Sequence, residues 1–145
     1  MELALFTGSV AYDNIHYYYN AQTNNGTIFY NCTSMRKVKI PEGVTNMRNT
    51  FRNCRALAFI DLPSTVVNTN GYIWSNTPAK CIICRAVNPP TFTQSEVYGT
   101  LNPVYGLYVP DESVNAYKQT SRWSEFANRI KPLSQFDIDY PNGFS

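Results

Sequence analysis

Four cysteines are the residues of this 145-residue chain best suited to metal binding or redox chemistry. Two of them, Cys81 and Cys84, form a CxxC motif. A zinc site would need a second pair of ligands beside this motif, and a thioredoxin-like site would need the motif at a helix N-terminus. The run is typical of a strand instead, in which residues three apart point to opposite faces. We therefore expect no metal and no cofactor at this motif.

The other two cysteines, Cys32 and Cys54, are 22 residues apart, which is the period of an internal repeat in this chain. If each repeat supplies one strand of a parallel sheet, equivalent atoms lie about 4.7 to 4.9 Å apart. A disulfide between Cys32 and Cys54 is then geometrically allowed. We favour a pair of small, buried, reduced thiols, because free cysteine is among the most buried residue types.

Catalytic chemistry has few candidate residues in this sequence. His16 is the only histidine and lies in a tyrosine run without a matching carboxylate, so a Ser-His-Asp or Cys-His arrangement is not expected. The carboxylate pairs Asp111/Glu112 and Asp137/Asp139 fall in a terminal cap and a tail, where no cleft is predicted. The sequence also lacks a glycine-rich phosphate loop. We therefore expect that the protein is not an enzyme.

Charge and hydropathy exclude two further classes of partner. Twelve Lys and Arg against ten Asp and Glu give a formal charge of +2 without a basic stripe, so a nucleic-acid partner is not expected. No run approaches the roughly 20 apolar residues of a bilayer helix, so membrane insertion is not expected either. Glu2 and the short apolar run at 3–6 do not fit a signal peptide, and we expect no export by that route.

The elements that must position these residues follow the 22-residue repeat, in which residues 28–49 align with residues 50–71. The identical pairs are Phe29/Phe51, Asn31/Asn53, Cys32/Cys54, Pro41/Pro63, Val44/Val66 and Asn46/Asn68. A third, degenerate unit follows, and after an insertion at 86–106 the string Leu-Tyr-Val-Pro at 107–110 restores the pattern. Since a unit of this size cannot bury its own apolar face, neighbouring units must stack.

Each unit contains a short alternating run, and these runs predict one parallel strand per coil. They lie at 37–40, 59–62, 81–84 and 106–109. Proline follows three of the four runs and ends the strand, because it cannot donate to a ladder. The inward ladders expected from this register are Met35/Leu57/Ala79, Val38/Ile60/Ile82/Leu107 and Ile40/Leu62/Cys84/Val109. They predict one continuous core in a single domain.

The pattern Phe-x-Asn-Cys-x-x-Leu-x-x-Ile-x-Leu-Pro-x-x-Val at 51–66 resembles the BspA-type leucine-rich repeat of surface proteins from gut and oral bacteria. Residues 107–133 are similar to the usual terminal unit of that family. Its aromatic positions and last strand fall on Tyr117, Trp123, Phe126 and Ile130. The resemblance implies a mainly β solenoid: a short right-handed leucine-rich-repeat coil with one parallel strand per 22-residue repeat and a small C-terminal helical cap.

The chain is expected to divide into four segments. They are a tyrosine-rich N-terminal cap or docking segment at 1–27, a solenoid of about four rungs at 28–110, a helical cap at 111–133 and a tail at 134–145. The candidate docking residues are Tyr12, Tyr17, Tyr18 and Tyr19. A terminal segment of this kind can cap the solenoid, but tyrosine also supplies large amphipathic contact area at low entropic cost and is enriched in interfaces, so cap and docking both stay open.

The C-terminal cap is expected to contain two short helices. Asp111 or Ser113 can cap the first and Ser121 the second. The first would bury Val114 and Tyr117, and the second Trp123, Phe126 and Ala127. In the tail, polar and apolar residues alternate from Phe136 to Tyr140, so this segment either adds an edge strand or stays free until a partner binds.

The outward positions of the strands form a candidate binding face. Its residues are Lys37, Lys39, Phe59, Asp61, Ile83 and Tyr108. The face runs from basic to apolar along the solenoid, and contiguous apolar patches mark either an interface or a covered surface. Both interpretations stay open. The covering residues would be Phe136, Ile138 and Tyr140 of the tail, or the loop with Tyr98 and Tyr105.

Two functions are compatible with these features. The resemblance implies a non-catalytic binding or adhesion module that recognises a protein or a glycan at the cell surface. The alternative is a structural virion component, a fibre tip or decoration subunit of a phage of gut bacteria, which would assemble in the host cytoplasm. The absence of a signal peptide favours this alternative, and a homo-oligomer would fit it.

Overall fold

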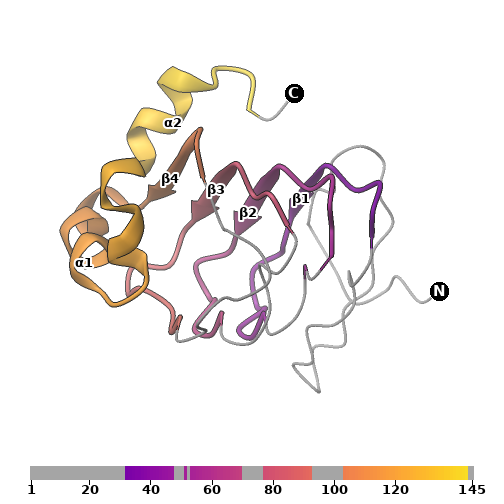
Figure 1. The fold of residues 1–145 in the computed structure, drawn as a ribbon. Helices are drawn as coiled ribbons and strands as arrows, with labels where there is room; N and C mark the ends of the chain where they lie inside the picture. The colour runs from indigo at the N-terminus through magenta and orange to yellow at the C-terminus, as the bar shows by residue number, and fades with distance from the viewer. Residues whose placement is uncertain (1–31, 48–50, 52, 70–76, 93–102, 144–145) are drawn as a thin grey trace.

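The computed structural model describes residues 32–47, 51, 53–69, 77–92 and 103–143. Their strands form one parallel sheet in the order β1-β2-β3-β4-β5, so strand order in space equals order in the chain (Figure 1). The strands are β1 (Lys37–Lys39), β2 (Phe59–Leu62), β3 (Cys81–Cys84), β4 (Gly106–Val109) and β5 (Ile130–Pro132). The four expected rungs and the last strand implied by the family resemblance are confirmed.

The register of the sheet follows the repeat. Val38 pairs with Ile60, and Ile60 with Ile82, each 22 residues further along the chain. Ile82 pairs with Leu107, because the insertion before β4 lengthens that coil without changing which residues face inward. All four side chains are completely buried, so the predicted inward ladder is confirmed. Each coil thus contributes the same positions to one continuous core.

A second hydrogen-bonded seam joins the coils away from the sheet. Asn46, Asn68 and Thr91 are linked by isolated parallel bridges. The N–H of Met47 donates to the carbonyl of Asn68 (2.9 Å), and the N–H of Thr69 donates to the carbonyl of Thr91 (2.9 Å). Because the backbone polar groups of the turns are paired between coils, the turns can close over an apolar interior without leaving those groups unsatisfied.

Short helices close the far end of the solenoid, beside β4 and β5 (Figure 1). They are η1 (Asp111–Ser113), α1 (Val114–Gln119) and η2 (Trp123–Arg129). The completely buried Trp123 packs edge-on against Tyr117 (5.4 Å between ring centroids) and Phe92 (5.0 Å). The predicted helical cap is therefore confirmed, with Tyr117 and Trp123 in the core and Phe126 packed against it, partly buried.

The predicted helix caps are wrong. Ser113 precedes α1, but its hydroxyl donates to the carbonyl of Val87 (2.6 Å), while Asp111 accepts from the N–H of Ser134 (3.0 Å). The residue before η2 is Arg122, with φ +73°, and not Ser121. These polar side chains are used to join the cap to the neighbouring coil and to the tail, and those tertiary bonds replace local capping.

The tail is neither a strand nor free, which corrects both expectations for it. Residues Leu133–Asp139 form the helix α2, which lies over the outer side of the sheet (Figure 1). A helix places Leu133, Phe136 and Tyr140 on one side, and these three pack against the sheet. Ile138, which strand alternation groups with Phe136 and Tyr140, points away and is 71% exposed.

Candidate functional site

The outer side of the sheet carries all six predicted face residues, but they differ in accessibility. Lys37 and Lys39 of β1 and Phe59 of β2 are half-buried. The other three are enclosed: Asp61 is 3% exposed, Ile83 1% and Tyr108 0%. The sequence left two interpretations of this face open, an interface or cover by the chain itself. Cover by the chain itself holds for Asp61, Ile83 and Tyr108.

Helix α2 covers Ile83 and Tyr108. Phe136 stands edge-on to Tyr108 with 5.2 Å between ring centroids, and Tyr140 lies 6.2 Å from the same ring. Cys81 and Ile83 complete this outer cluster, which is separate from the main core. Of the predicted covering residues, Phe136 and Tyr140 contact the sheet and Ile138 does not. Tyr98 lies outside the described residues.

The CxxC motif is divided between the two clusters, as predicted. Cys81 belongs to the outer cluster, whereas Cys84 lies in the main core, where its sulfur is 3.3 Å from the hydroxyl of Tyr117. Burial raises the pKa of Cys81 to about 12 and that of Cys84 to about 11. Both thiols are thus protonated at neutral pH. Within the described ranges, no cluster of three or more His, Cys, Asp or Glu could hold a metal ion.

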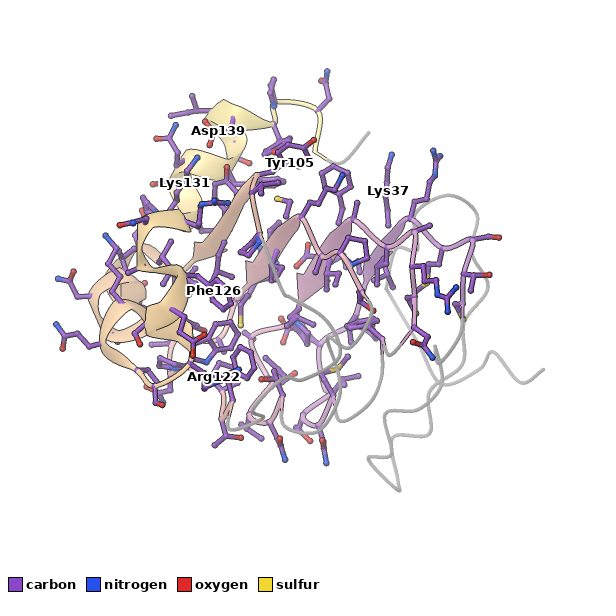
Figure 2. All side chains as sticks on the ribbon, viewed as in Figure 1. Lys37, Tyr105, Arg122, Phe126, Lys131 and Asp139 are labelled. Carbon is purple, nitrogen blue, oxygen red and sulfur yellow. The ribbon has the colours of Figure 1, made fainter. Side chains whose placement is uncertain are left out.

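A polar contact fixes the end of α2. The Tyr108 hydroxyl donates to Asp139 (2.5 Å), whose carboxylate is 3.5 Å from the ammonium of Lys131 (Figure 2). Burial, together with the Asp139 carboxylate, raises the pKa of Tyr108 above its usual range. The same hydrogen bond lowers the pKa of Asp139. Gly106, with φ +122°, leaves room for the tyrosine ring, since a Cβ there would lie 2.8 Å from it.

Asp61 is held by an ion pair that the sequence did not reveal. The guanidinium of Arg85 donates to both carboxylate oxygens, from Nε at 2.8 Å and from a terminal nitrogen at 3.0 Å. Arg85 occupies the repeat position that Pro41 and Pro63 hold in the preceding coils. The buried carboxylate is therefore engaged in a bidentate pair with a partly exposed guanidinium, and Asp61 contributes to the stability of the fold.

Replacing Arg85 with methionine is expected to lower the free energy of unfolding by about 2 to 3 kcal/mol, because the buried Asp61 carboxylate loses its counter-charge while the aliphatic stem is kept. Urea unfolding followed by circular dichroism measures the change. Adding Asp61→Asn to this variant should recover most of the loss. An Arg85→Met protein as stable as the wild type would contradict the structural role of the pair.

The open part of the outer face combines aromatic and basic side chains. Phe59 stacks on Tyr105 with 6.3 Å between ring centroids and 18° between planes, and it meets Tyr140 edge-on at 6.4 Å. Tyr105 is 48% exposed. Lys37 is the register neighbour of Phe59, and it projects from the same side of the sheet as Tyr105 (Figure 2). We call Lys37, Lys39, Phe59, Tyr105 and Tyr140 the aromatic–basic patch.

The candidate docking residues Tyr12, Tyr17, Tyr18 and Tyr19 lie outside the described residues, as does His16. Sequence reasoning named Tyr140 as a covering residue but missed the helix that brings it beside Phe59. The signal for it was the helical spacing of Leu133, Phe136 and Tyr140, which competes with the strand alternation in the same segment.

Comparison with known families agrees with the repeat architecture. Residues 2–94 match the BspA type leucine rich repeat region (6 copies), which covers more than half of the chain and includes the tyrosine-rich segment. A search among curated proteins found no match. In the part of the chain that the structure describes, no helix is both long and apolar enough to cross a membrane. The 22-residue register, the parallel sheet and this match together show that the chain belongs to the family of BspA-type leucine-rich repeats.

Proposed function

We propose that this protein is a non-catalytic binding module and that the aromatic–basic patch receives a protein segment with acidic and apolar side chains. Leucine-rich repeats generally mediate binding, and the family is typically non-catalytic. The observation that carries the proposal is the patch itself. It presents stacked, partly exposed aromatic rings beside the strand β1 that carries Lys37 and Lys39, at the margin of the cluster that α2 covers.

The chemistry of the patch favours a protein ligand of this kind. Phe59 and Tyr105 offer rigid apolar area with little side-chain entropy to lose, which is why aromatic residues are enriched at protein interfaces. Lys37 is the register neighbour of Phe59, and Lys39 follows on the same face of β1. Arg36 and Lys80 are exposed just before β1 and β3. A ligand carrying Asp or Glu next to an apolar residue would complement both properties. The virion alternative has no separate support among the described residues.

Selection from a displayed library of random peptides tests the proposal. We expect the full chain to enrich peptides that contain acidic residues next to aromatic or aliphatic ones. The double variant Lys37→Glu/Lys39→Glu should bind the enriched peptides at least about tenfold more weakly, or about 1.4 kcal/mol, because like charges then face each other. Isothermal titration calorimetry measures these affinities, and raising the salt concentration should weaken the wild-type complex.

Lys118→Glu is the matched control, because Lys118 is exposed on α1 at the opposite end of the solenoid from β1. Its affinity should stay within about twofold of wild type. Enrichment of peptides without acidic residues would contradict the proposed ligand chemistry, and so would equal affinity in both charge-reversal variants. A glycan array that gives the only binding signal would assign the patch to sugars instead.

A further inference from the structure

Cys32 and Cys54 occupy the same place in the two coils that carry β1 and β2. The carbonyl of Cys32 accepts from the N–H of Met35 (3.3 Å), and the carbonyl of Cys54 accepts from the N–H of Leu57 (3.1 Å). The two turns therefore have the same hydrogen bond, one repeat apart. Stacked parallel coils place equivalent Cα atoms about 4.7 to 4.9 Å apart, which is inside the range that disulfides bridge.

The two thiols are in direct contact. The Cys54 thiol donates a hydrogen bond to the Cys32 sulfur, and the structure has both residues in the reduced form. Cys54 is completely buried in the main core, whereas Cys32 is half-buried at its margin. Cys32 is therefore the more accessible residue of the pair, and Cys54 is the enclosed one.

The contact also separates the acidities of the two thiols. The hydrogen bond from Cys54 outweighs the effect of burial and lowers the pKa of Cys32 to about 7. The same hydrogen bond, together with burial, raises the pKa of Cys54. At neutral pH a large fraction of Cys32 is thus thiolate, the form that attacks disulfides. Cys81 and Cys84, on opposite faces of β3, have neither a thiol neighbour in their motif nor a lowered pKa.

We propose that Cys32 and Cys54 form a reversible redox pair that reacts with small disulfides of the glutathione type and closes a disulfide between the β1 and β2 coils. In the first step the Cys32 thiolate attacks one sulfur of the small disulfide, its S–S bond breaks, and one small thiolate leaves. Cys54 then loses its proton to that thiolate or to solvent and attacks the Cys32 sulfur, which expels the second small thiolate. Two protein thiols are oxidised, and one small disulfide is reduced to two thiols.

Peptide mapping of the full, folded chain tests this directly. After incubation with oxidised glutathione near pH 7.5, alkylation and digestion, we expect mass spectrometry to find Cys32 and Cys54 in one linked pair of peptides. Cys81 and Cys84 should be alkylated only after denaturation. The reaction rate should rise with pH to a half-maximum near 7, the pKa of Cys32. The oxidised protein should melt on the order of 5 to 10 °C higher, and dithiothreitol should reverse the change.

Single serine variants separate the two roles. Cys54→Ser should stop at a stable mixed disulfide on Cys32, and Cys32→Ser should not react while folded. Cys84→Ser is the control that leaves the pair intact. Three results would overturn the proposal: a wild-type mixed disulfide that never resolves, a linkage between two chains, or no reaction in the folded protein when the urea-unfolded protein reacts. The wild-type map decides these outcomes even if a variant fails to fold.

Discussion

Ile83→Asp is expected to lower the free energy of unfolding by at least about 4 kcal/mol, because it places an unpaired carboxylate in a closed apolar cluster. Ile83 is 1% exposed between the sheet and α2, and its register neighbour Asp61 already carries a negative charge. Urea unfolding at pH 7 measures the loss. The result separates a covered face from an open one, since the same change on an exposed strand face shifts stability by at most about 0.5 kcal/mol.

The pH dependence identifies the cause of that loss. Burial raises the pKa of the introduced carboxyl in the folded state above its unfolded value of about 3.9. The part of the penalty that comes from the charge is therefore full above the folded pKa and disappears as the pH falls through it toward about 4. Ile83→Asn, of similar size and without charge, should show a gap from wild type that does not change with pH.

Lys80→Asp provides a matched exposed control three residues upstream, before β3 begins. Its midpoint should remain close to that of the wild type. If Ile83→Asp is as stable as this control, α2 does not cover the sheet in solution. The outer cluster of Cys81, Ile83 and Tyr108 would then become a candidate binding surface together with the aromatic–basic patch.

Trp123→Ala is expected to cost about 3 to 5 kcal/mol of unfolding free energy, the range for removing a large aromatic side chain from a core. Its ring joins the last coil to the cap through contacts with Phe92 and Tyr117, and its Nε1 donates to the carbonyl of Pro90 (2.8 Å). Thermal unfolding followed by circular dichroism measures the loss. Without the Trp123 side chain, the apolar interior of the β4 coil would be exposed to water at the end of the solenoid.

Two variants define what the Trp123 result means. Trp123→Phe keeps much of the apolar area but leaves the Pro90 carbonyl without its donor, so it should cost less than alanine while remaining destabilising by about 1 to 2 kcal/mol. Ser124→Ala, exposed in the same helix, should be close to neutral. A loss below about 1 kcal/mol in Trp123→Ala would contradict the packing of the cap on the solenoid.

The strands and the main core were predictable because the repeat imposes the same demand on every coil. Val38, Ile60 and Ile82 follow one another at intervals of 22 residues. Apolar residues at equivalent positions of successive coils are buried from water only when the coils stack. The local alternation of apolar residues predicted each strand, and the 22-residue period predicted which strand it pairs with. This reasoning also separated Cys81 from Cys84, since backbone geometry alone makes successive side chains of a strand point to opposite faces.

Contacts without a period were not predictable in the same way. Asp61 and Arg85 are 24 residues apart and break the repeat register, so neither residue predicts the other. Ser113 and Asp111 were correctly seen as polar residues at helix starts, but their hydrogen bonds go to Val87 and Ser134. In each case a tertiary neighbour offered the better partner, and the local pattern contains no information about that neighbour.

By itself, the sequence determined the repeat, the parallel strands, the inward ladders and the family, because these depend on periodic burial. Only the tertiary structure decided that the tail is a helix and that it covers half of the outer face. A helix as short as α2 (Leu133–Asp139) is not stable alone in water, so its conformation is selected by the apolar surface on which Phe136 and Tyr140 pack. That surface exists only after β2, β3 and β4 have been brought side by side.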